Sequence, residues 1–103
     1  MRTKRFRIPL SEGNILDVKL NIREGDIKGF VLNLRCRIGD EWHEVYRVDT
    51  AHGYLHEQRY WVSPEPIPLM QHTSMQYAFE FYMGHVRKNF SRYRRYYLER
   101  MVR

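Results

Sequence analysis

The sequence predicts an α+β fold, in which an antiparallel sheet of about five strands, arranged as a meander, is covered on one face by a long C-terminal helix. Three observations support this prediction. Apolar and polar residues alternate through much of the first 62 residues, as they do in half-buried strands. Glycine-containing turns separate the alternating runs. In the last third of the chain the apolar period changes to 3.6 residues, which indicates an amphipathic helix.

The expected strands differ in how clearly they alternate. The second is the most regular, because Leu16, Val18, Leu20 and Ile22 alternate with charged and polar residues. A glycine lies in each of the first three turns, where it favours a reversal of the chain. The strands are expected at residues 4–10, 16–23, 30–37, 41–49 and 54–62, and these turns at residues 11–14, 24–26 and 39–40.

Residues 1–103 are expected to form a single domain. Strands occupy residues 4–62, and a proline-rich connector at residues 63–72 is unsuited to a helix. The single cysteine, Cys36, excludes an internal disulfide. No apolar run reaches the length of a membrane span, and no apolar segment follows the basic N-terminus. The sequence therefore predicts a cytoplasmic protein that does not bind membranes.

The helix is expected at residues 73–101, where Thr73 and Gln76 have the spacing of a capping box. A straight helix of this length is about 43 Å long, whereas a domain of this size is about 35 Å across. The end of the helix is therefore expected to overhang the sheet. Three tyrosines among arginines would be exposed there, which would suit stacked bases, another protein or a homodimer formed through this helix: Tyr93, Tyr96 and Tyr97.

Charge is concentrated at the two ends of the chain. Residues 1–10 carry +4 and residues 84–103 carry +6, so the middle sums to −4. Basic ends on an acidic body favour an anionic partner, either nucleic acid or an acidic protein. Arginines outnumber lysines 14 to 4, and guanidinium suits bidentate phosphate contacts. RNA is the expected partner, and the residues expected to contact it are Tyr54, Arg87, Lys88, Arg92, Arg94 and Arg95.

The hairpin at residues 41–62 carries the most ionisable chemistry. If Asp49 lies opposite Tyr54, then Arg47 lies opposite His56, close enough for both to act on one phosphate. One face of this hairpin is expected to be polar and aromatic, and the other to pack into the core. The polar face would carry His43, Val45, Arg47, Asp49, Tyr54, His56, Gln58 and Tyr60, and the core face Trp42, Glu44, Tyr46, Val48, Leu55, Glu57, Arg59 and Trp61.

This pattern fits metal-independent RNA cleavage, which needs a base, an acid and cations that stabilise the phosphorane charge. His56 and His52 would act as acid and base. Arg47 and Arg59 would stabilise charge, and Asp49 would orient an imidazole. Residues four apart in a straight strand are about 13 Å apart, so the glycine after His52 must fold that histidine back over the sheet. No cofactor is expected.

Two other interpretations stay open. Asp49, His52 and His56 form a two-histidine, one-carboxylate set that suits a metal-dependent enzyme. Alternatively, Asp49 caps the turn, His52 is solvated and His56 bonds its neighbours, so that the hairpin is only structural. The protein would then be a non-catalytic module that binds nucleic acid or a protein through its C-terminal helix.

Residues 46–56 resemble the signature of a family of small uncharacterised archaeal and bacterial proteins. These have strands first, a D-x-A-H-G-x-x-H segment, which is residues 49–56 here, and a C-terminal helix. More distantly, the layout resembles the TumE-like toxins of toxin–antitoxin pairs, which carry an aspartate followed by histidines at a strand end. The resemblance implies Asp49, His52 and His56 as the functional set. It also implies a toxin-like role with a small antitoxin-like protein partner. Combined with the RNA-cleavage chemistry of the hairpin and the basic helix, this predicts a toxin-type ribonuclease.

Overall fold

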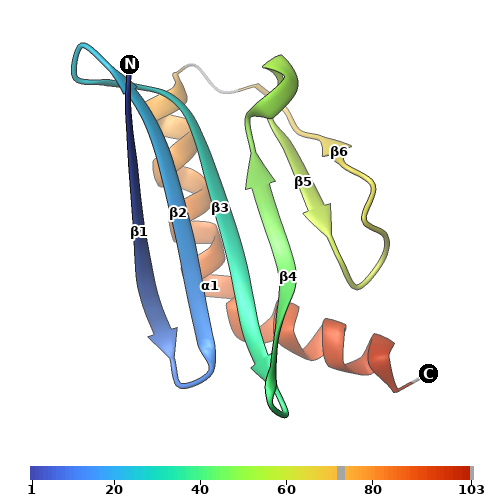
Figure 1. Ribbon diagram of the computed structural model, residues 1–103. Helices are drawn as coiled ribbons and strands as arrows, with labels where there is room; N and C mark the ends of the chain where they lie inside the picture. Colours follow the sequence, from blue (N-terminus) through green and yellow to red (C-terminus); the bar gives the residue numbers. More distant parts are fainter. Residues whose placement is uncertain (72–73, 103) are drawn as a thin grey trace.

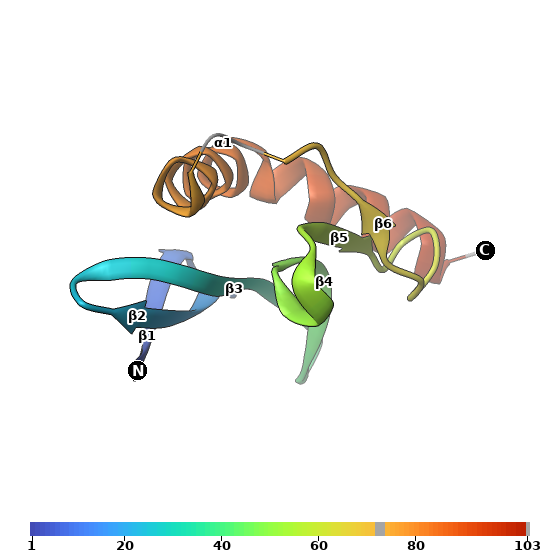
Figure 2. The same cartoon turned by 90° about the horizontal axis from the view of Figure 1, so that it is seen from above.

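The computed structural model describes residues 1–71 and 74–102, apart from the side chain of His52. An antiparallel six-stranded sheet follows the order of the chain, β1-β2-β3-β4-β5-β6, and helix α1 covers one face of it (Figures 1 and 2). The predicted α+β meander is confirmed, with one strand more than expected. The elements are β1 (Arg2–Ser11), β2 (Asn14–Arg23), β3 (Asp26–Ile38), β4 (Glu41–Asp49), a 3-10 turn (Ala51–Gly53), β5 (His56–Arg59), β6 (Ile67–Pro68) and α1 (Met75–Met101).

The hydrophobic core lies between α1 and the face of the sheet that we call the inner face. The apolar residues that alternate along β2 and β3 form the sheet side of this core, and Leu16, Leu32 and Leu34 are fully buried. Helix α1 covers these residues with one side, as its apolar stripe predicts. Its buried side chains are Ala78, Tyr82, Val86 and Tyr93. The opposite, outer face of the sheet has no helix over it (Figure 2).

The predicted glycine turns connect the first four strands. Gly13 and Gly39 have φ angles of +76° and +63°, a region that glycine enters without a steric penalty. The fifth strand is shorter than expected, because β5 ends at Arg59 rather than at residue 62. The connector contains a strand that was not predicted: Ile67–Pro68 pairs with β5 as β6. Pro68 is tolerated there because an edge strand does not need every backbone donor.

Helix α1 begins later than the sequence suggested. Ser74 is its N-cap, and its hydroxyl oxygen accepts a 3.0 Å hydrogen bond from the backbone N–H of Tyr77. The third helical position is thus Tyr77 rather than Gln76, so the predicted capping box does not form. Thr73, its expected first residue, lies outside the described residues.

Helix α1 bends in its middle, and its second half crosses β4 and continues past it toward the C-terminus (Figure 1). The prediction that the three tyrosines near this end are exposed is wrong. Asn89 lies in the middle of α1 and donates through Nδ2 to the carbonyl of His85, 2.9 Å away, a contact of the kind that bends helices. As a result Tyr93 is only 7% exposed. Tyr96 and Tyr97 are partly buried and pack against the core.

Candidate functional site

The β4–β5 hairpin has a register two residues away from the predicted one. Asp49 lies opposite His56, and Arg47 lies opposite Gln58. The predicted register was wrong because the 3-10 turn Ala51–Gly53 lengthens the connection between the strands. A shift of two residues keeps each side chain on its face, because the side-chain period of a strand is two. Arg47, Asp49 and His56 therefore do share the outer face, as predicted.

A β-bulge changes the faces of the residues before it. The register shifts between Leu34 and Arg35, which leaves Val45 of β4 as the extra residue. Val45 is buried in the core instead of lying on the polar face. His43 points toward the helix, where Nδ1 lies 3.1 Å from the hydroxyl of Tyr97. The predicted faces of Trp42, His43, Glu44 and Val45 were wrong for this reason, and Trp42 is 43% exposed instead of packing in the core.

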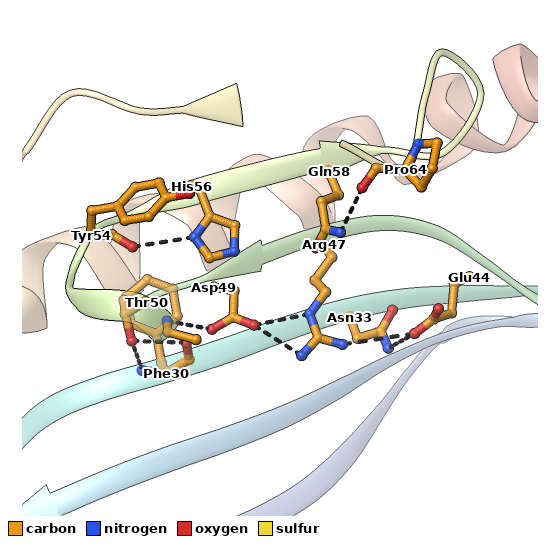
Figure 3. Close-up of polar contacts among 11 residues, drawn as sticks. Phe30, Asn33, Glu44, Arg47, Asp49, Thr50, Tyr54, His56, Gln58 and Pro64 are labelled. Carbon is orange, nitrogen blue, oxygen red and sulfur yellow. Dashed lines mark hydrogen bonds and ion pairs between the residues drawn. The ribbon is translucent and has the colours of Figure 1, made fainter. Parts of the chain in front are cut away.

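Asp49 is fully engaged by its surroundings (Figure 3). Its Oδ2 accepts hydrogen bonds from Nε and Nη2 of Arg47 at 3.1 and 2.9 Å. Its Oδ1 accepts one from the backbone N–H of Ala51 at 2.7 Å, which stabilises the 3-10 turn. The imidazole of His56 lies above this carboxylate, but Nδ1 is 3.3 Å from the carbonyl oxygen of Tyr54. This geometry matches the interpretation in which Asp49 caps the turn and His56 bonds its neighbours.

Both groups are shielded from solvent. His56 is 4% exposed and Asp49 is 6% exposed, and the ring of Tyr54 lies against the imidazole with 5.0 Å between centroids. A general acid or base must come within hydrogen-bond reach of the substrate, and little of the His56 imidazole is in contact with solvent. The side chain of His52 lies outside the described part of the structure.

Arg59 is separated from the other predicted catalytic residues. It lies on the inner face, opposite Tyr46, and its Nε donates to Oε1 of Glu57 at 2.7 Å. The other carboxylate oxygen, Oε2, accepts a 2.5 Å hydrogen bond from the hydroxyl of Tyr46. Burial raises the pKa of Tyr46, and the hydrogen bond to Glu57 raises it further, so the phenol stays protonated and donates. Tyr46, Glu57 and Arg59 thus form a polar cluster, of which Tyr46 and Glu57 are buried. In the sequence, the only indication of it was that Glu57 lies on the predicted core face of the hairpin.

His85 of α1 extends this cluster, with its Nε2 2.5 Å from the hydroxyl of Tyr93. Burial lowers the pKa of His85 below the ordinary value of 6.5; Glu57 opposes this shift, whereas Arg59 and Lys88 add to it. Because the imidazole of His85 binds a proton more readily in the unfolded chain, the free energy of unfolding is highest above about pH 6.5 and decreases as the pH falls below that value. Urea unfolding between about pH 5 and pH 8 should show this loss for the wild type and a smaller one for His85→Gln. Equal pH dependence of the two proteins would contradict the prediction.

The basic residues predicted on α1 divide into two groups. Arg87, Lys88, Arg92 and Arg95 are exposed, and none of them forms an ion pair with a residue that the structure describes; we call these four the α1 cation row. Arg94 instead points back to the sheet, where Nη1 donates to Oδ1 of Asn14 at 3.2 Å. Arg94 is thus a packing residue.

Neither a metal-binding cluster nor a membrane-spanning helix is present among the described residues. No group of three His, Cys, Asp or Glu residues among them is placed to hold a metal ion. The predicted set of Asp49, His52 and His56 is described in only two of its side chains. In the same part of the chain, no helix is long and apolar enough to cross a membrane.

A family model described as a domain of unknown function, DUF7718, matches residues 1–102. The chain belongs to the DUF7718 family. This agrees with the expected membership of an uncharacterised family, whereas the similarity to TumE-like toxins stays a prediction. No curated protein and no solved structure is significantly similar to this DUF7718 domain.

Proposed function

We propose that this protein is a non-catalytic RNA-binding module that contacts RNA phosphates through the α1 cation row. The observation that supports it is the exposure of Arg87, Lys88, Arg92 and Arg95 without an ion pair to any described residue. Lys88 and Arg92 are four residues apart, and like charges at this spacing destabilise a helix. A polyanion would offset that cost. Three of the four cations are arginines, which suit phosphate oxygens.

The buried hairpin supports binding rather than turnover. Asp49 already accepts hydrogen bonds from Arg47 and from the backbone of Ala51, and His56 is covered by Tyr54. The hairpin in turn forms one wall of the core that holds α1, since Tyr46 of β4 contacts Tyr93 of α1 with 4.6 Å between ring centroids. In this proposal, the hairpin positions the helix and the helix binds the ligand.

A salt titration tests the proposal. Binding of a short single-stranded RNA, followed by fluorescence anisotropy, is expected to weaken steeply as salt rises from about 50 to 200 mM. If the four cations contact four phosphates, the slope of log affinity against log salt should be near −3, because each contact contributes about −0.7. No binding, or affinity that does not change with salt, would contradict the proposal and favour a protein partner.

The same RNA also tests the predicted toxin-type ribonuclease. We expect the RNA to stay intact with the wild-type protein in the presence of a chelator, and His56→Ala to bind it with unchanged affinity. Cleavage by the wild type that His56→Ala abolishes would overturn the non-catalytic proposal and support the ribonuclease. Cleavage that appears only when divalent metal is added, and that His56→Ala abolishes, would support the metal-dependent enzyme.

A further inference from the structure

A cationic hollow lies on the outer face of the sheet, on the side opposite α1. Its volume is about 490 Å³, within the size range of small-ligand pockets. A neighbouring hollow of about 270 Å³ shares Lys19, Val31 and Arg47 with it. We call the larger one the outer hollow. Its charged lining comes from three strands and consists of Arg5, Arg7, Asp17, Lys19 and Arg47.

Two of these cations have their charge neutralised within the protein. Arg7 donates to Asp17 at 2.8 Å, and Arg47 is paired with Asp49 at 2.9 Å. Arg5 and Lys19 form no ion pair with a described residue. They are also directly opposite each other in the register of β1 and β2, and like charges in directly opposed positions destabilise a sheet. The outer hollow therefore contains two adjacent positive charges without a carboxylate partner among the described residues, and a bound anion would offset their repulsion.

We propose that the outer hollow binds a nucleoside 5′-monophosphate, with its phosphate between Arg5 and Lys19. A phosphate monoester carries close to two negative charges at neutral pH, which matches the two unpaired cations, whereas a phosphodiester carries only one. Inorganic phosphate would fill little of the volume. The site is independent of the α1 cation row, which belongs to the other layer of the fold.

The rest of the lining suits a base next to the phosphate. Val31 offers an apolar side chain on β3, opposite Lys19 in the strand register. Asn33 is nearby on the same face, and its Oδ1 is buried and has no hydrogen-bond partner among the described residues. An unmade hydrogen bond of this kind is costly. A small rotation of this amide toward the outer hollow would let Oδ1 accept a hydrogen bond from a base amino group.

The test uses adenosine 5′-monophosphate, adenosine and inorganic phosphate as probes, with binding followed by calorimetry and by the shift in melting temperature. The nucleotide is expected to bind and to raise the melting temperature, inorganic phosphate to bind more weakly, and adenosine to bind weakest. Arg5→Gln and Lys19→Gln are each expected to weaken nucleotide binding about tenfold or more. Lys4→Gln removes the same charge from β1, where it faces the other way opposite Leu20, and should leave binding unchanged.

Stability without ligand provides an independent readout. Lys19→Gln removes one of two opposed like charges, so in a buffer free of phosphate it should be at least as stable as the wild type. It should also lose the stabilisation that the nucleotide gives. The proposal is overturned if the nucleotide does not bind or if both glutamine variants bind it as the wild type does. Equal affinity for inorganic phosphate would overturn it in favour of a simple anion site.

Discussion

The Tyr46→Phe variant is expected to be less stable than the wild type by roughly 2 kcal/mol, with a melting temperature about 10 °C lower. Tyr46 is 0% exposed and Glu57 is 4% exposed, and the Tyr46 hydroxyl is the donor to Oε2 of Glu57. Removing that hydroxyl leaves the buried Oε2 of Glu57 without its hydrogen-bond donor. Losing a hydrogen bond to a buried charged group lowers the free energy of unfolding more than losing an exposed one. Thermal and urea unfolding, followed by circular dichroism, would measure the change.

A double variant separates the lost hydrogen bond from a simple packing defect. Tyr46→Phe combined with Glu57→Leu replaces both partners by apolar groups of similar shape, a change that can be nearly neutral. The side chain of Arg59, which also donates to Glu57, is 47% exposed and would turn into water. The double variant should therefore recover most of the lost stability. If the free energy of unfolding of Tyr46→Phe lies within about 0.5 kcal/mol of the wild-type value, the hydroxyl contributes little to stability.

Neutralising the α1 cation row is expected to cause the largest loss of RNA affinity. The variant carries Arg87→Gln, Lys88→Gln, Arg92→Gln and Arg95→Gln. Each phosphate contact contributes about 0.7 to the slope of log affinity against log salt, so loss of four contacts should lower the affinity a few hundredfold near 0.1 M salt. The slope itself should approach zero in this variant. Fluorescence anisotropy at several salt concentrations measures both quantities. The fold should survive, because all four side chains are exposed and glutamine is a good helix former.

The matched control removes the same net charge from the sheet. Arg2, Lys4, Arg23 and Arg37 are exposed, and replacing each by glutamine should reduce RNA affinity far less than the helix variant does. Equal losses in the two variants would indicate that RNA responds only to net charge, which would contradict a defined binding surface on α1. Binding of adenosine 5′-monophosphate should be the same in the helix variant and the wild type, because the outer hollow lies on the other layer.

Part of the candidate site was predictable from the sequence, because it depends on the period of a strand. Arg47, Asp49 and His56 share one face in the structure although the predicted register was two residues off. Their burial was not predictable. Tyr54 lies against His56, and Asp49 bonds the turn that follows it. The arrangement of side chains around that turn decides both contacts.

The sequence by itself determined the α+β class, the first four strands, their glycine turns and the presence of a long amphipathic helix. These features depend on residues close together in the chain, whose periodicity and turn chemistry act locally. The tertiary structure decided the bulge at Val45, the bend of α1 and the burial of Glu57 beneath it. It also placed Arg5 opposite Lys19. Each of these features depends on which strands and faces meet in space, because the energies of packing and charge act between residues far apart in the sequence.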